Sequence, residues 1–199
     1  TVDVSAAAAT DITLTGGSAG DTIDIGAISS TDTIVGGGGT DTLTVAAATS
    51  VANAAGVSGV ETLSVVSASA ASTITQDMDA FSVTTVNVGD TNNEDVALTD
   101  VAATQNTLGL VAGSTGTTSL ARKVDTSADS LTINIGAAAA GVTITAVTTS
   151  NEETMTINSS GGANVITTLD AADLTSLTVT GAKGLSIANA IANAASLVT

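Results

Sequence analysis

Residues 36–44 read Gly-Gly-Gly-Gly-Thr-Asp-Thr-Leu-Thr, and this stretch decides the fold. It fits the nonapeptide pattern G-G-x-G-x-D-x-U-x, in which U is aliphatic, at every specified position. Residues 16–24 read Gly-Gly-Ser-Ala-Gly-Asp-Thr-Ile-Asp and fit the same pattern except at the fourth position, where Ala19 replaces glycine. Two matches that are 20 residues apart indicate a structural repeat.

The repeat extends beyond the two glycine stretches. An acidic residue, a threonine and an aliphatic residue follow one another at 21–23, 41–43 and 61–63. Looser versions continue in steps of 20 to 24 residues, with aliphatic anchors at Val86, Leu108, Leu131, Met155 and Leu177. A second aliphatic series with similar steps runs between these anchors, so each repeat contains two strands. Polar and aliphatic residues alternate around the anchors, which is strand periodicity.

This periodicity predicts the fold class. A pair of short strands cannot bury its apolar face alone, whereas stacked pairs form a continuous core. We therefore predict an all-β fold, a parallel β-solenoid (β-helix) of about nine coils with 20–24 residues per coil. We expect a single solenoid domain over residues 1–199, as a segment of a longer chain. A β-sandwich is the alternative, but sandwich cores normally contain aromatic residues, and Phe81 is the only one here.

The composition narrows the possible functions. The chain has 19 acidic and 3 basic residues, a formal net charge of −16. Nucleic acid is therefore not an expected partner, because phosphate binding needs clustered Lys and Arg. The negative charge either serves solubility or is neutralised by metal cations. Without Cys or His the chain has no disulfide, thiol nucleophile or imidazole base. No run of about 18 apolar residues exists, so we expect no membrane insertion.

Both glycine stretches combine the residue types that suit a hard cation. Glycines allow a tight loop whose carbonyl groups turn inward, and they stand at Gly16, Gly17, Gly36, Gly37 and Gly39. Asp21 and Asp41 supply carboxylate oxygens, which are ligands for Ca²⁺. On adjacent coils these carboxylates would lie about 5 Å apart, and a bridging Ca²⁺ would turn their repulsion into attraction. We predict a Ca²⁺ site here, with a solvated row of polar residues as the alternative.

Further acidic residues extend this prediction. Oxygen-bearing side chains also occupy the position two residues before the later anchors, at Glu61, Thr84, Asn106, Asp129, Glu153 and Thr175. On the opposite edge of the predicted coils, Asp11 and Asp32 follow threonines without paired glycines. We predict a second metal column at Asp11 and Asp32, which is a weaker match to the pattern.

With residues 16–24 and 36–44, and with the looser phrases at 59–65 and 174–181, the chain resembles RTX-type secreted proteins. It resembles more closely the calcium-dependent surface-layer (S-layer) proteins that Gram-negative bacteria export by type I secretion. The resemblance implies a Ca²⁺-loaded solenoid that folds outside the cell and assembles laterally. It thus implies a secreted structural protein of the cell surface whose partner is itself, in a homo-oligomeric lattice or filament, with cell-surface polysaccharide as a further partner.

An enzyme of the β-helix kind is a rival interpretation, because such enzymes use paired carboxylates on acidic polysaccharides. It would need basic residues to match the charge of the substrate. Arg122 and Lys123, beside Asp125, are the only candidates, and two adjacent basic residues are typical of a solvated turn. We therefore expect no enzymatic activity.

An adhesin or an ice- or surface-binding module is the alternative function. Outward Thr-x-Thr pairs such as Thr42 and Thr44 would form its binding face. A flat face needs the same ladder in every coil, and the positions that match Thr44 hold Asp24, Ser64, Asn87 and Gly109. Surface-layer assembly is therefore the preferred prediction.

Overall fold

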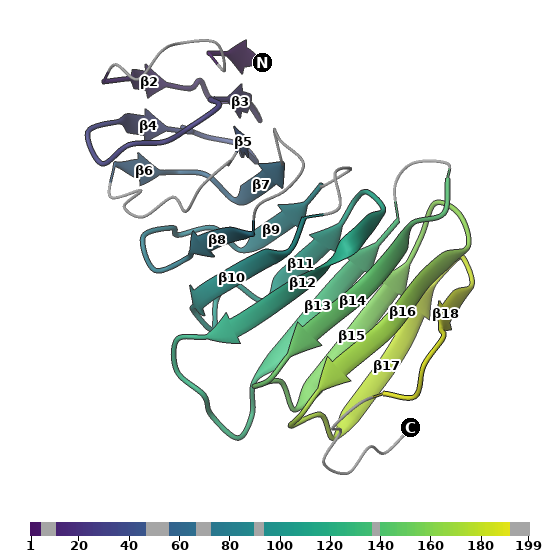
Figure 1. The fold of residues 1–199 in the computed structure, drawn as a ribbon. Coiled ribbons are helices and arrows are strands. Elements are labelled where there is room, and N and C mark those ends of the chain that lie inside the picture. The colour runs from purple at the N-terminus through teal and green to yellow at the C-terminus, as the bar shows by residue number, and fades with distance from the viewer. Residues whose placement is uncertain (5–10, 47–55, 67–72, 90–93, 137–139, 192–199) are drawn as a thin grey trace.

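The computed structural model describes residues 1–4, 11–46, 56–66, 73–89, 94–136 and 140–191, which contain eighteen strands and no helix (Figure 1). The long sheet consists of β1 (Val2–Asp3), β3 (Thr22–Asp24), β5 (Thr42–Ala46), β7 (Thr62–Val66), β9 (Thr85–Val88), β11 (Thr107–Leu110), β13 (Ser130–Ile135), β15 (Thr154–Ser159) and β17 (Ser176–Gly181). The N-terminal sheet consists of β2 (Thr13–Thr15), β4 (Thr33–Val35) and β6 (Val57–Ser58). The C-terminal sheet consists of β8 (Ile74–Asp77), β10 (Val96–Val101), β12 (Ser114–Arg122), β14 (Thr143–Thr149), β16 (Asn164–Ala171) and β18 (Leu185–Ile187).

All paired strands are parallel, and strands of the long sheet alternate along the chain with strands of the other two sheets. The prediction of an all-β parallel solenoid is confirmed. The solenoid has about seven turns, fewer than the nine expected. The long sheet does contain nine strands, but β1 and β6 have only two residues each, so the turns that contain them are incomplete as β-structure.

One column of side chains runs through the whole long sheet. We call it the central aliphatic column, and the pairing register defines its nine members as Val2, Ile23, Leu43, Leu63, Val86, Leu108, Ile133, Ile157 and Val179. The seven inner members are at most 3% exposed. Each coil therefore buries its aliphatic residue against the coils before and after it, which a single coil could not do.

The predicted stacking of the anchors is wrong at one step. Leu108 stacks on Ile133 rather than on Leu131, whereas Leu131 stacks on Met155 as expected. The shift is two residues, and because side chains alternate with a period of two, it leaves every side chain on its predicted face. The sequence pattern alone could not decide between Leu131 and Ile133, since both are aliphatic and both are buried.

The slip divides the predicted column of oxygen-bearing residues. In the first part, the backbone bonds place Asp41, Glu61 and Thr84 in successive coils. In the second part, Glu153 and Thr175 follow Asp129 in the same way. These are two separate rows at one edge of the long sheet.

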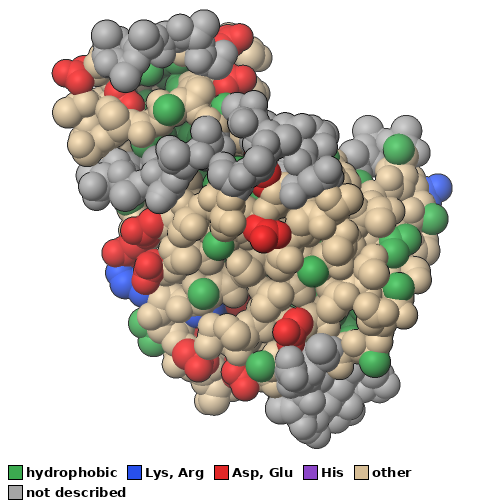
Figure 2. Space-filling view, in the orientation of Figure 1, with side chains coloured by type: hydrophobic (Ala, Val, Ile, Leu, Met, Phe, Trp, Pro, Cys, Tyr) green, Lys and Arg blue, Asp and Glu red, His purple; other side chains and the backbone are tan. Residues whose placement is uncertain are grey.

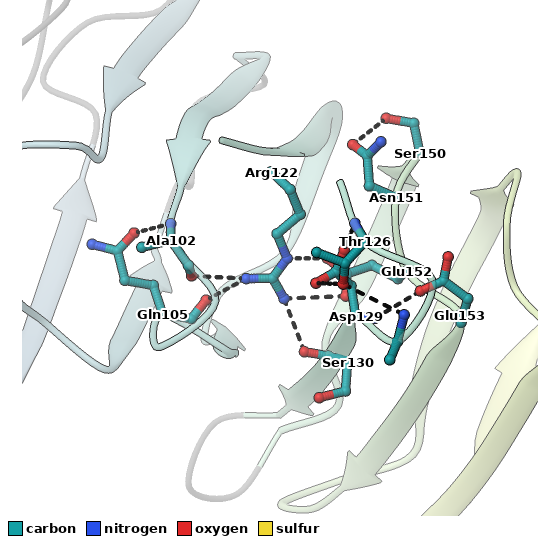
Figure 3. A network of polar contacts seen from close by, with 11 residues as sticks. Ala102, Gln105, Arg122, Thr126, Asp129, Ser130, Ser150, Asn151, Glu152 and Glu153 are labelled. Atoms are coloured by element: carbon teal, nitrogen blue, oxygen red, sulfur yellow. Dashed lines mark hydrogen bonds and ion pairs between the residues drawn. The ribbon is translucent and has the colours of Figure 1, made fainter. Parts of the chain in front are cut away.

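A buried ion pair lies between coils of the C-terminal half (Figure 3). Nε of Arg122 donates to Oε1 of Glu152 at 2.6 Å, and the two side chains are 1% and 0% exposed. The other guanidinium nitrogens donate to the carbonyl oxygens of Ala102, Gln105 and Ser130. Burial raises the pKa of Glu152, although the hydrogen bond and the charge of Arg122 act to lower it. The interpretation of Arg122 as part of a solvated turn is wrong, because this side chain holds several coils together.

Candidate functional site

The two glycine stretches form stacked loops, one between β2 and β3 and the other between β4 and β5. The N–H of Gly38 donates to the carbonyl oxygen of Gly17 at 2.9 Å. Gly37 and Gly39 have φ values of 106° and 110°, in the left-handed region that favours glycine. A Cβ atom on Gly36 would lie 1.9 Å from the carbonyl oxygen of Gly59. The loops therefore need glycine both for their backbone conformation and for the close approach of the next coil.

The structure places Asp21 and Asp41 on adjacent coils, as predicted. The N–H of Asp21 donates to Oδ1 of Asp41 at 2.7 Å, and the N–H of Asp41 donates to Oε2 of Glu61 at 2.8 Å. Each carboxylate thus accepts a backbone hydrogen bond from the preceding coil, which favours its ionised form. The second oxygen of Asp21 accepts the N–H of Gly17 at 2.9 Å.

The second oxygen of Asp41 differs from that of Asp21. Asp41 is 0% exposed, and within the described residues its Oδ2 has no hydrogen-bond partner. A buried carboxylate oxygen without a partner is costly unless a cation compensates it. A Cβ atom on Gly36 would lie 2.7 Å from Oδ2 of Asp41 and close to the carbonyl oxygen of Gly59. Gly36 therefore keeps open a small space that a carboxylate oxygen and a carbonyl oxygen border, and these are the donors that Ca²⁺ takes.

The opposite edge looks different. Asp32 is buried, and its two oxygens accept the N–H groups of Ile12 at 2.8 Å and Ser29 at 2.7 Å. Burial acts to raise the pKa of Asp32, but these hydrogen bonds outweigh it and hold that pKa below its ordinary value. Asp11 is exposed. The backbone hydrogen bonds are sufficient to explain the buried carboxylate of Asp32, and a metal column at Asp11 and Asp32 stays a prediction.

A cluster that the sequence did not predict lies in the C-terminal half. Carboxylate oxygens of Asp125, Glu153 and Asp173 lie within 4.8 Å of one another. These residues line an open surface pocket of about 300 Å³, together with Thr126 and Ser127. They come from the loop after β12, the start of β15 and the turn after β16. The signal in the sequence was weak, since only Glu153 belonged to a predicted column.

Charge on the surface follows the composition. Acidic side chains are spread over the face shown in Figure 2, while basic side chains are seen mostly at its margins. Lys123 is exposed and pairs with Asp79. Divalent cations would therefore meet negative potential over much of this face.

Comparisons with known proteins give no relative: no family model, no curated protein and no solved structure matches the chain. Within the described residues, no helix is long and apolar enough to cross a membrane. The candidate site is therefore defined by its own geometry, in which Asp41 is the residue best placed to hold a cation.

Proposed function

We propose that the protein is a structural component of an extracellular surface layer, a calcium-stabilised β-solenoid that assembles with copies of itself. The observation that supports this most is the buried Oδ2 of Asp41 beside the glycine loop. Asp41 would hold the ion together with carbonyl oxygens of the stacked loops, and the bound Ca²⁺ would compensate the carboxylate charge there. The resemblance to RTX-type and surface-layer proteins rests on the same two loops.

The positions of the basic residues support a structural role over an enzymatic one. The guanidinium group of Arg122 is enclosed by Glu152 and by backbone carbonyl groups. Lys123 pairs with Asp79 on the surface. Neither side chain projects into the pocket beside Asp125, where an acidic polysaccharide would need positive charge.

We predict that calcium stabilises the fold through Asp41. A ligand that binds only the folded state at 100 times its dissociation constant adds about 2.7 kcal/mol, which raises Tm by about 5–10 °C for a chain of this size. Asp41→Asn should lose most of this calcium-dependent increase, because the amide removes the buried negative charge. Circular dichroism melting curves in millimolar Ca²⁺ and in excess chelator measure the difference.

The matched control for this experiment is Asp24→Asn. Asp24 lies in the adjacent coil on the outer face of β3, next to the buried Ile23 and outside both glycine loops. This variant should keep the full calcium response of the wild-type protein. An Asp41→Asn variant with an undiminished calcium response would remove Asp41 from the site.

One observation favours the alternative function, a surface-binding module. Eight threonines stack in register on the outer face of the long sheet, at Thr22, Thr42, Thr62, Thr85, Thr107, Thr132, Thr156 and Thr178. The sequence argument against a regular face used the neighbouring column, which is irregular, and missed this one. Strands of a sheet lie about 4.8 Å apart, so hydroxyl and methyl groups repeat regularly, as binding to ice or another ordered solid requires. A module of this kind would stay monomeric in calcium and produce thermal hysteresis.

A further inference from the structure

Both ends of the central aliphatic column are incompletely covered. Val2 is 39% exposed and Val179 is 52% exposed, whereas Ile157, which precedes Val179 in the column, is 0% exposed. Other inward-facing residues of the last coil, Leu185 and Ile187, are also only partly buried. The pattern that buries every inner member therefore stops at β1 and at β17, each of which has a paired strand on one side only.

We propose that the 199-residue chain stacks head to tail on a second copy, with β17 of one molecule paired in parallel with β1 of the next. This inference rests on the proposed self-assembly and specifies the contact that produces it. Val179 of one copy would lie beside Val2 of the other and continue the central aliphatic column. Edge strands offer unpaired N–H and C=O groups for this pairing.

The residues around the two valines are compatible with this contact. In the same register, Thr178 would lie beside Thr1, so that the outer row of threonines would continue from one copy into the next. Thr180 would lie beside Asp3, where a hydroxyl group can donate to a carboxylate. Both Val179 and Val2 stand on parallel strands with their side chains on the inner face, so no strand has to reverse.

The charges of the two ends are complementary. The last coil, residues 176–191, contains Lys183 and no acidic residue. The first coil contributes Asp3 and Asp11. Two copies would therefore meet with a basic end against an acidic end, whereas two N-terminal ends would repel each other. The contact joins two different surfaces and does not close, so repetition produces a filament.

Single substitutions at the two ends test the contact. Val179→Asp and Val2→Asp should each raise the protein concentration for half-maximal assembly in Ca²⁺ by at least about tenfold, because a carboxylate would have to be buried against aliphatic side chains. Val124→Asp is the matched control, since Val124 is 66% exposed and lies outside both end coils. Sedimentation velocity measures assembly, and melting curves establish that each variant is folded.

Mixing the two variants tests the polarity of the contact. Val2→Asp keeps an intact last coil and Val179→Asp keeps an intact first coil, so an equimolar mixture should form dimers that do not grow. A Val2→Asp variant that dimerises alone would show that last coils pair with each other, which overturns the proposal. Variants that assemble as well as the wild-type chain overturn the contact and leave the proposed function standing. A wild-type chain that stays monomeric, with residues 192–199 or another segment covering Val179, contradicts both.

Discussion

Replacing Arg122 with methionine is expected to lower the free energy of unfolding by about 3–5 kcal/mol, because it leaves a buried charge without its partner. Glu152 is 0% exposed and accepts two hydrogen bonds from Arg122. The carbonyl oxygens of Ala102, Gln105 and Ser130 lose their donors in the same substitution. Urea denaturation of the wild-type and variant proteins measures the loss.

The loss should become smaller as the pH falls. Arg122 acts to lower the pKa of Glu152, so the pKa of this carboxyl rises further in Arg122→Met. A carboxyl group with a raised pKa in the folded state contributes stability below its unfolded pKa and loses it as the pH rises through the folded pKa. Protonation at acidic pH therefore removes the unpaired charge in the variant. Lys123→Met is the control, since its ion pair with Asp79 is exposed and should contribute little. A small, pH-independent loss in Arg122→Met would contradict this account.

Gly36→Ala is expected to destabilise the protein by at least about 3 kcal/mol, because the added methyl group overpacks a closed site. The new Cβ atom would lie 1.9 Å from the carbonyl oxygen of Gly59 and 2.7 Å from Oδ2 of Asp41. One contact is with backbone that already pairs with the next coil, so neither side can move freely. The variant should also lose its calcium response, since the methyl group occupies the space in front of Asp41.

Gly38→Ala is the matched control within the same loop. A Cβ atom there would find its nearest neighbour at 3.5 Å, an ordinary van der Waals contact, and no positive φ restricts the position. Its melting temperature and calcium response should stay close to those of the wild-type protein. Equal effects of the two alanine substitutions in circular dichroism melting curves would show that the loop does not enclose a specific space.

Much of the fold could be predicted from the repeat. The glycine stretches fixed the coil length, and the stacking of Ile23, Leu43 and Leu63 follows the predicted register. The slip between Leu108 and Leu131 could not be predicted, because a shift of two residues preserves the inward and outward faces. The buried pair of Arg122 and Glu152 was also missed, since contacts across 30 residues depend on how the coils stack.

The candidate site was predicted in outline only. The pattern placed Asp21 and Asp41 on adjacent coils, but it treated the two carboxylates as equivalent. The structure distinguishes them, because Asp21 is partly exposed with its Oδ2 bonded to Gly17, whereas Oδ2 of Asp41 is buried and has no partner among the described residues. This difference depends on the packing of the following coil against each loop, which no local motif contains.

Calcium-driven assembly is tested most directly by static light scattering of the wild-type protein during a calcium titration at high protein concentration. The negative charge of −16 should keep molecules apart in chelator, where a monomer or short oligomer is expected. Millimolar Ca²⁺ should then produce a large, chelator-reversible increase in mass, as ordered sheets or filaments form. A mass that stays monomeric across the titration would contradict the surface-layer function and would favour the surface-binding alternative.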